Sequence, residues 1–421
     1  MSGLLAVLWA CVGTAEPPHD PSPPRSSETG HAPTATGPTG VVDTGAGPSV
    51  SAAVTWVAPP RAVPAGGRSQ DHATVALRSD GTGMVVYTDD LRLRVARVGS
   101  DGALSPVPIE SLANHGQVTS TPTGFLVVAT HDGGEGLYGF PFGVDAAPAG
   151  PSVLLSTRHT LLPDVDVRRR SDGTVQGIVA ATDGVSLGCI AFTDAFRARA
   201  PAPCPAPVSP EAATGTVAVE QTAVGPLYSW TELAPDRSLA VFVSDGVAPP
   251  LVVARLGDGV TMAGRPTLAT VGDATPARED DGLVVAYRGA TASGAPVGSY
   301  LWHLGVSGVT TWRLGAHPDR GDVERVVISP IVGERLVVAY EAEGELWLEV
   351  RDAMDGAPLS PPEPVATEGP RLPRRPSVDL VLGDGGELQG VISWESGEPG
   401  SAVEDDGRVV RVRRFTVSGA R

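Results

Sequence analysis

A short apolar strand recurs seven times along the chain, and this repeat limits what the chain can fold into. The first copy is GMVVYTD at 83–89. Its relatives are VVATH at 127–131, VAATD at 179–183, YSWTE at 228–232, VAYR at 285–288, VAYE at 338–341 and ISWE at 392–395. Counted at equivalent positions, successive copies are 42, 52, 49, 57, 53 and 54 residues apart. A period of roughly 40–50 residues with several short strands per unit is typical of propeller blades. The repeat therefore predicts an all-β, seven-bladed β-propeller.

Each repeat contains enough strands for one blade. A first strand such as Thr74–Arg78 precedes the recurring strand, and a third such as Leu91–Val98 follows it. Six units continue into a fourth, proline-rich segment, which suits an outer edge because an edge strand leaves one row of N–H groups unpaired. The expected blades span residues 70–112, 113–158, 159–207, 208–256, 257–318, 319–369 and 370–421.

The seventh repeat has no fourth strand of its own. A lone strand candidate lies before the first blade, in residues 51–60. We expect Val54–Val57 to pair with the strand around 409–415 and so to close the ring, because an open seam would leave an unpaired edge. The propeller domain is accordingly placed at residues 51–421.

Blades three and seven are similar to each other at a constant offset of 213 residues. Five identities fall within fifteen positions, and they pair Pro163 with Pro376, Val165 with Val378, Asp166 with Asp379, Gln176 with Gln389 and Gly177 with Gly390. The repeat has no Trp-Asp ending, and it matches no named repeat signature. The likeness supports equivalent blades without assigning an activity.

The charge of the chain narrows its possible partners. All 31 basic residues are arginine, and the net charge is −17. Nucleic-acid binding requires a concentrated basic face, so this balance argues against a nucleic-acid partner. It fits a soluble, self-repelling protein, which we expect to be a monomer.

The first eleven residues form a short apolar run that ends in Cys11. The run is too short to cross a bilayer as a helix, which needs about 20 residues. It resembles the end of a bacterial lipoprotein signal peptide: Leu8, Ala10 and Cys11 match the lipobox, whereas Trp9 departs from it and no basic residue precedes it. The resemblance implies lipidation of Cys11. The other interpretation is an ordinary cytosolic start followed by a tail.

Residues 12–50 are rich in Pro, Gly, Thr and Ser. Such a segment buries too little apolar surface to fold, so we expect a disordered tether with a root-mean-square span of roughly 35–40 Å. The order of parts resembles that of exported β-propeller lipoproteins of high-GC bacteria. That resemblance implies a cell-envelope location, with the outer membrane or the extracellular side favoured because Val12, and not Asp, follows the cysteine.

Two further cysteines, Cys189 and Cys204, lie in blade three on either side of an expected hairpin turn. In an oxidising compartment they can form a disulfide, and closing a loop of about 15 residues contributes near 3 kcal/mol in the chain-entropy model. The other interpretation is two buried thiols that never meet.

Several short motifs resemble catalytic or metal-binding motifs, but their surroundings in the sequence do not fit those functions. Ser186 lies in a G-x-S-x-G pattern, but that motif requires a strand-to-helix turn, and here the serine enters a β-strand. Asp164 and Asp166 are spaced as in a calcium loop, but Arg168 and Arg169 occupy positions that the loop needs for other residues. His72, His115 and His159 begin blades one to three without sharing one register, so we expect turn or channel-lining histidines and no metal site.

The remaining candidate site is formed by acidic residues from several repeats. Connections between second and third strands should emerge on one face of a propeller, and in this chain they are rich in acids. The candidate acidic binding face comprises Asp89, Asp90, Asp132, Glu135, Asp183, Glu232, Glu341 and Glu395. Such a face could bind the cofactor Ca²⁺ or a basic partner. Hairpin turns also prefer Asp for purely structural reasons.

Two functions from different classes follow. The first is a non-enzymatic binding module, anchored to the membrane only through its lipid, for an unknown protein or glycan. The alternative is a propeller-hosted hydrolase or lyase, with or without a metal, with acids at the channel mouth. A spacer without any ligand is a third option. An enzyme would require several of these acids to converge beside a pocket.

Overall fold

A computed structural model describes residues 51–64, 70–109, 111–131, 135–193, 195–235, 239–256, 266–270, 283–289, 298–305, 308–314, 326–342, 345–366, 373–397 and 408–419. Cys11, the tether at 12–50 and Asp132 lie outside these residues. All regular elements in the described part are β-strands, and none of its segments is a helix long and apolar enough to cross a membrane.

The strands form seven antiparallel sheets. Blade one comprises β3 (Gln70–Leu77), β4 (Gly83–Asp89), β5 (Arg92–Val98) and β6 (Leu104–Val107). Blade two comprises β7 (Ala113–Thr121), β8 (Gly124–His131), β9 (Leu137–Gly143) and β10 (Val153–Ser156). Blade three comprises β11 (Leu161–Arg169), β12 (Val175–Thr182), β13 (Leu187–Thr193) and β14 (Ala198–Pro201). Blade four comprises β15 (Ala213–Gln221), β16 (Pro226–Leu233), β17 (Leu239–Ser244) and β18 (Leu251–Leu256).

The remaining three blades follow in chain order. Blade five comprises β19 (Thr267–Thr270), β20 (Leu283–Gly289), β21 (Gly298–Gly305) and β22 (Gly308–Leu314). Blade six comprises β23 (Val326–Ile328), β24 (Arg335–Ala342), β25 (Glu345–Asp352) and β26 (Glu363–Pro364). Blade seven comprises β27 (Pro373–Leu382), β28 (Leu388–Ser396) and β29 (Val409–Gly419), with two N-terminal strands described below.

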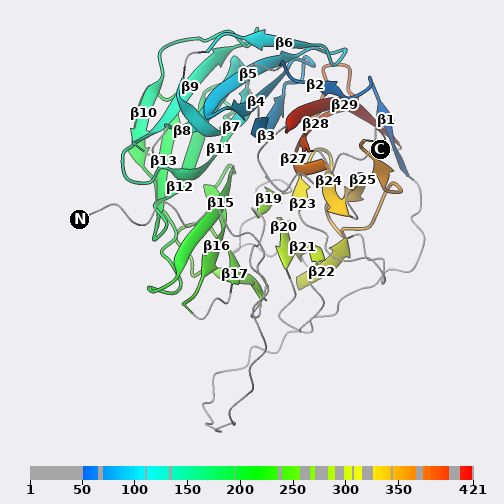
Figure 1. The fold of residues 1–421 in the computed structure, drawn as a ribbon. Coiled ribbons are helices and arrows are strands. Elements are labelled where there is room, and N and C mark those ends of the chain that lie inside the picture. The colour runs from blue at the N-terminus through cyan, green and yellow to red at the C-terminus, as the bar shows by residue number, and fades with distance from the viewer. Residues whose placement is uncertain are drawn as a thin grey trace, which may run out of the picture. The chain divides into compact units, whose positions relative to one another are not determined.

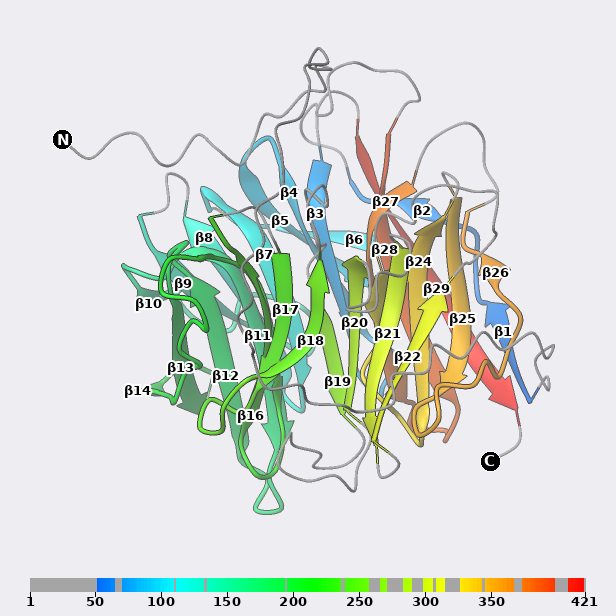
Figure 2. The same ribbon diagram turned by 90° about the horizontal axis from the view of Figure 1, so that it is seen from below.

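The seven sheets form a ring. The inner strands β3, β7, β11, β15, β19, β23 and β27 contact one another in turn, and β27 contacts β3 (Figure 1). Figure 2 shows strands of neighbouring blades running side by side. The predicted seven-bladed β-propeller is confirmed.

The ring is closed by the N-terminal strand β1 (Ala52–Trp56), which pairs with β29. Trp56 lies opposite Phe415 and Ala52 opposite Gly419. Closure by an N-terminal strand is therefore confirmed, but β1 pairs with Phe415–Gly419 and meets the expected range 409–415 only at Phe415. A second short strand, β2 (Arg61–Ala62), pairs with Val412 and Arg411 and was not foreseen.

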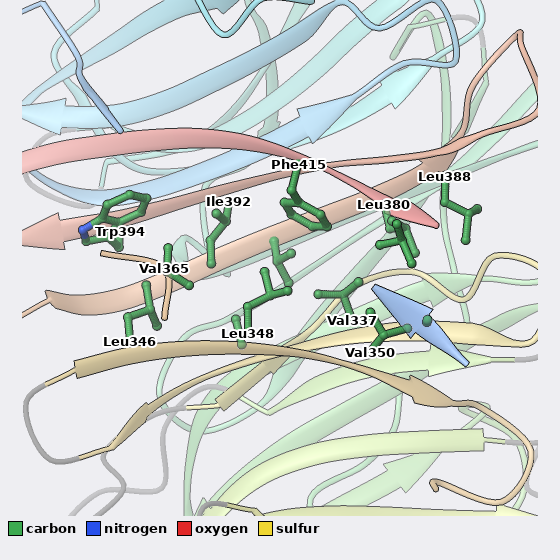
Figure 3. Close-up of a cluster of buried hydrophobic side chains, with 14 residues drawn as sticks. Val337, Leu346, Leu348, Val350, Val365, Leu380, Leu388, Ile392, Trp394 and Phe415 are labelled. Carbon is green, nitrogen blue, oxygen red and sulfur yellow. The ribbon is translucent and has the colours of Figure 1, made fainter. Parts of the chain in front are cut away.

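The second strand of each blade packs against both neighbours. In β24, Val337 and Ala339 pack toward blade seven. Leu336 and Val338, on the other face of the same strand, pack toward blade five. Figure 3 shows the core between blades six and seven, including Val337 and the fully buried Trp394. Burying such a side chain contributes roughly 1.5–3 kcal/mol, and burial on both faces explains why the repeat is continuously apolar.

Four of the described inner strands begin with a β-bulge in which one residue has the left-handed backbone conformation. His72, His115, Leu162 and Arg375 have φ of 50°, 50°, 47° and 50°, and each lies at a register shift against the second strand. This conformation costs roughly 1–2 kcal/mol for a residue other than glycine. His72 and His115 occupy equivalent positions, whereas His159 precedes β11, so the three histidines do not share one register, as expected.

The likeness between blades three and seven has a structural cause. The Oδ2 of Asp166 accepts a hydrogen bond from the N–H of Gln221 in the next blade at 2.7 Å. Asp379 does the same with the N–H of Leu77 at 2.6 Å. Both side chains thus hold a neighbouring inner strand. Asp166 also lies within strand β11, which agrees with the rejection of a calcium loop.

Candidate functional site

Four acids of the predicted face lie inside strands and are buried. Asp89, Glu232, Glu341 and Glu395 are only 2%, 3%, 5% and 1% exposed. They belong to β4, β16, β24 and β28. The expectation that all of these acids lie in exposed connections is therefore wrong for these four residues.

Two of these carboxylates hold the bulges of the next blade. Glu341 accepts a hydrogen bond from the N–H of Arg375 at 2.5 Å. Glu395 accepts one from the N–H of His72 at 2.8 Å. Each therefore binds the N–H of a left-handed residue. Because a buried unpaired N–H would cost about 1–3 kcal/mol, these acids stabilise the seams between blades.

Thr130 and Thr182 play a similar part in blades two and three. The hydroxyl of Thr130 donates to the carbonyl of Thr160 at 2.5 Å, and that of Thr182 donates to the carbonyl of Thr214 at 3.2 Å. In both cases the acceptor lies at the start of the next blade. In these four blades one position of the repeat thus carries either Thr or Glu, according to whether a carbonyl or an N–H needs a partner.

Glu232 binds the connection between β14 and β15. Its two carboxylate oxygens accept the N–H groups of Val208 and Ser209 at 2.8 and 3.1 Å, and Oε1 also accepts the indole N–H of Trp230 at 2.9 Å. It thereby fixes the connection that enters blade four. Its carboxylate is fully engaged by these donors.

The other acids of the face differ in their surroundings. Asp89 lies 3.6 Å from the Nε of Arg94, while its Oδ1 is buried without a hydrogen bond. Asp90 is exposed in the two-residue turn between β4 and β5, and Glu135 is exposed before β9. Among the described residues no group of three or more His, Cys, Asp or Glu side chains suits a metal ion.

Asp183 lies in a polar cluster at the seam between blades two and three. Its Oδ1 accepts the N–H groups of Val185 and Ser186 at 3.0 and 2.8 Å. Arg158 contacts Oδ2 at 3.0 Å. Burial works to raise the pKa of Asp183, but these donors outweigh it and lower the pKa to about 2. This carboxylate caps a hairpin turn.

Ser186 contacts a histidine that the sequence did not place beside it. The Oγ of Ser186 lies 3.1 Å from the Nε2 of His159. Asp183 approaches the same Nε2 at 3.6 Å, and Gly188 packs against the other side of the ring near Nδ1. A catalytic triad needs the carboxylate on the nitrogen that faces away from the serine. The arrangement therefore does not orient His159 as a base, and Ser186 lies in the hairpin that the sequence predicted.

Beside this cluster lies a cavity of about 470 Å³. Its walls come from the outer strands of blades two and three and are mostly apolar. They comprise Leu137, Leu154, Leu155, Ser156, His159, Gly188, Cys189, Ile190, Arg199, Ala200, Pro201 and Ala202. Burial lowers the pKa of His159 in this wall. The size and composition fit a ligand pocket, in which apolar walls carry a few polar groups.

One wall of the cavity is fastened by a disulfide. The structure joins Cys189 of β13 to Cys204, with a Cα–Cα distance of 5.5 Å. Arg199 lies on the neighbouring strand β14 and donates from Nη1 to the carbonyl of Leu154 at 2.7 Å. The disulfide holds the segment after β14 to β13, and the hydrogen bond connects β14 to blade two.

A second polar cluster lies where three inner strands of the ring begin. Blades seven, one and two place Arg375, His72 and His115 there in succession, from their equivalent bulges. The two imidazole rings lie 4.0 Å apart between centroids. Asp71 lies beside His72, with 3.0 Å between Oδ1 and Nδ1. The sequence showed these residue types but not their convergence, because the bulge has no sequence signature.

Deeper in the ring, three carboxyls have raised pKa values. Burial raises the pKa of Asp166 and of Asp379 to about 7, and that of Glu220 to about 8. The charge of Asp166 adds to the shift of both others, although Asp379 lies in a non-adjacent blade. The Oε1 of Glu220 accepts a hydrogen bond from Thr270 at 2.7 Å, whereas its Oε2 is buried without one.

No protein-family profile matches the chain, and no curated protein matches it significantly. A catalytically inactive variant of virginiamycin B lyase from Staphylococcus aureus, with quinupristin, is 9% identical over 86% of this chain and 99% of its own, with a TM-score of 0.48. The six-bladed fungal lectin from Aleuria aurantia is 11% identical over 71% and 97%, with a TM-score of 0.42.

A third similar structure is the WD40 domain of Toxoplasma gondii coronin. It is 11% identical over 88% of this chain and 87% of its own, with a TM-score of 0.48. These likenesses are too distant to transfer a ligand or an activity.

Proposed function

We propose that this protein is a lipid-anchored recognition propeller of the cell envelope, displayed on a tether, that binds a partner protein without catalysis. The binding site is the cavity between the outer strands of blades two and three. The partner contributes an apolar side chain flanked by acidic residues. The observation that carries the proposal is the cavity itself, with its apolar walls and basic rim.

The apolar part of the cavity supports an apolar anchor. Leu154 lines it and is 45% exposed, so a partner side chain can cover an apolar surface that water now contacts. Burying apolar surface contributes roughly 25 cal/mol per Å². Buried anchors of this kind usually dominate the binding energy of an interface.

The arginines at the rim of the cavity support the acidic residues that we propose for the partner. Arg199 lines the cavity and is exposed, and Arg158, whose side chain is 73% exposed, lies next to His159 in the wall. On a chain with a net charge of −17, this local positive charge favours an acidic partner segment by complementarity. Arg158 also pairs with Asp183, so Arg199 is the main contributor.

A peptide-display selection against the full chain tests this function. We expect enriched peptides to carry one large apolar residue with acidic neighbours, and to bind a Leu154→Asp variant at least ten-fold more weakly. Leu382→Asp is the matched control, since that leucine is 51% exposed in blade seven. Peptides without this pattern, or equal losses in both variants, would contradict a site at this cavity. Enrichment of glycans and not peptides in a parallel glycan screen would do so too.

The anchor is tested separately. Expressed in a bacterial host that processes lipoproteins, the chain should incorporate labelled fatty acid and fractionate with the outer membrane. Cys11→Ala should abolish both, whereas Cys189→Ala should leave labelling intact. Unlabelled wild-type chain in the cytosol would disprove the envelope location and leave the cavity hypothesis untouched.

A hydrolase or lyase with channel-mouth acids is the less favoured alternative. Glu341 and Glu395, the acids that would do acid–base work, already accept backbone N–H groups of the next blade. Thermal unfolding with and without millimolar Ca²⁺ separates the two functions, because a ligand that binds only the native state raises Tm. A rise in Tm that is abolished by neutralising Asp89, Asp183 and Glu232 would favour the alternative and its calcium site.

A further inference from the structure

The cavity between blades two and three offers one cationic group beside apolar walls. Among the described residues that line it, Arg199 is the only one with a fixed charge. The other polar side chains of the lining are already engaged. The Oγ of Ser156 accepts the N–H groups of Arg158 and His159 at 3.1 and 3.0 Å. The Nε2 of His159 lies 3.1 Å from the Oγ of Ser186.

The guanidinium of Arg199 has donors to spare. Its Nη1 donates to the carbonyl of Leu154 at 2.7 Å. Within the described part of the chain its side chain makes no other hydrogen bond or ion pair. Arginine has five N–H donors in a planar fork that matches a carboxylate. The remaining donors of Arg199 can therefore bind one carboxylate in a bidentate manner.

The hydrogen bond to Leu154 also fixes where this charge lies. Leu154 belongs to β10, lines the cavity and is 45% exposed. The guanidinium is thus held against the residue that carries the exposed apolar surface. A carboxylate bound by Arg199 and an apolar group packed on Leu154 must consequently lie close together in the partner.

A C-terminal apolar residue carries both groups on one Cα atom. In an extended segment successive side chains point to opposite faces, so an acid directly beside the apolar residue points away from it. A glutamate two positions away lies on the same face, but ordering its long side chain costs conformational entropy. The α-carboxylate of a chain end avoids both difficulties, and capture of such a carboxylate is an established mode of peptide recognition.

We propose that the cavity recognises the C-terminal residue of its partner, with the α-carboxylate on Arg199 and the apolar side chain on Leu154. This inference rests on the proposed function and narrows it. The chain end supplies one of the acidic groups, and the acidic residues before it lie toward Arg158. An internal segment of the same composition lacks the α-carboxylate, so Arg199 selects chain ends.

Fluorescence anisotropy on the full-length protein tests the proposal with synthetic peptides. The probes are labelled peptides that end in Asp-Glu-X, where X is leucine, isoleucine, phenylalanine or tryptophan. Each is made as the free acid, as the amide, and as an amide with two glycines added after X. For the preferred X we expect the free acid to bind at least ten-fold tighter than both amides, because they lack the charge that Arg199 binds.

Substitutions of arginine assign this preference to one side chain. Arg199→Gln should weaken binding of the free acid and remove its advantage over the amide. Arg199→Lys keeps the charge without the planar fork and should retain only part of the advantage. The matched control is Arg197→Gln, because Arg197 is exposed in the turn before β14 and is not part of the cavity lining. It removes the same charge and should leave the preference intact. Unchanged circular dichroism and Tm would show that each variant is folded.

The outcomes separate this inference from the proposed function. Equal binding of acid and amide, or a preference that survives in Arg199→Gln, overturns the inference alone, provided that Leu154→Asp still weakens binding. Acetyl-leucine that binds as tightly as the peptides would also overturn it, because the site would then serve a free small carboxylate. If no peptide of the series binds, the inference is overturned, and the proposed function falls with it only if display selection enriches no binder either.

Discussion

Blades three and seven have the same interior but fasten their outer edges differently. In each, a glycine of the second strand lies opposite a phenylalanine of the third: Gly177 with Phe192, and Gly390 with Phe415. In blade three the outer strand follows in sequence, and a disulfide from Cys189 holds the chain beyond it. In blade seven the outer strand β1 comes from the other end of the domain and has no covalent bond to β29; strand pairing and the contact of Trp56 with Phe415 hold it.

The difference shows which interactions the repeat fixes and which are added locally. The Asp and Gly positions recur because they serve seams and packing inside the ring, where the geometry of every blade is similar. The outer edge has no neighbouring blade to impose a geometry. A covalent bond suffices there in blade three, whereas blade seven needs the long-range pairing because it also closes the ring.

The largest expected effect comes from removing that pairing. Deleting residues 51–62 takes away β1 and β2, so β29 would keep β28 but lose both partners on its outer edge. Phe415 would also lose the ring of Trp56, which lies 5.8 Å away. We expect the shortened chain to lose cooperative unfolding and to aggregate through the open edge. Adding a peptide of residues 51–62 should restore a cooperative transition. A shortened chain with an unchanged Tm would show that closure is dispensable.

Adding a methyl group at the shared glycines comes next. An ideal Cβ at Gly177 would lie 2.1 Å from the Cζ of Phe192, and one at Gly390 equally close to that of Phe415. We expect Gly177→Ala and Gly390→Ala each to cost about 3 kcal/mol, because overpacking a buried site displaces its neighbours. Chemical denaturation measures both. Adding Phe192→Leu should recover part of the first loss, and Gly397→Ala, where a Cβ would meet open space, is the control.

The sequence was sufficient for the architecture because the repeat depends on local chemistry. Strands buried on both faces must be apolar throughout, and their spacing is visible without any structure. The closing strand was also predictable, since the seventh unit lacked a fourth strand. Trp56, a large side chain in this strand, indicated that the strand packs against the domain. In the structure the guanidinium of Arg413 lies 4.0 Å from the ring centroid of Trp56.

The candidate sites were not predictable to the same degree. The left-handed bulge position holds His72, His115, Leu162 and Arg375, which share no side-chain property. Its stabilising partner can be very distant in sequence, as Glu395 is 323 residues from His72. An acid after an apolar strand therefore looked like a turn residue, although it lies buried in the strand. Residues so far apart in sequence come together only because the ring of blades closes.

Breaking the disulfide of blade three should lower the stability of the chain by an intermediate amount. Blade seven has no corresponding bond. The two cysteines of the disulfide are 15 residues apart, and closing such a loop contributes about 3 kcal/mol. A Cys189→Ala, Cys204→Ala chain should therefore have a lower Tm. Reductant should lower the Tm of the natural chain to the same value and leave the double variant unchanged. If reductant shifted both chains equally, the effect would not come from this bond.

The smallest effect, and the only one that depends on pH, concerns the shared aspartates. Burial raises the pKa of Asp166 and Asp379 to about 7, well above the usual value of 3.8. Below about pH 4 both carboxyls are protonated in the folded and the unfolded chain. Between about pH 4 and 7 the unfolded chain loses these protons first, so stability is lost as pH rises through this window.

Asp166→Asn and Asp379→Asn remove the ionisable groups while keeping a side-chain oxygen for the N–H of Gln221 or Leu77. Each pKa unit corresponds to about 1.4 kcal/mol, and the loss of a charge-assisted hydrogen bond offsets part of this. We expect a net gain of about 2 kcal/mol at pH 8 and none at pH 4, measured by Tm across this range. Asp183→Asn should show no such gain at pH 8, because hydrogen bonds lower the pKa of that carboxyl to about 2. A gain in only one of the two blades would mean that the shared aspartate has different surroundings in blades three and seven, and that the likeness ends at the sequence.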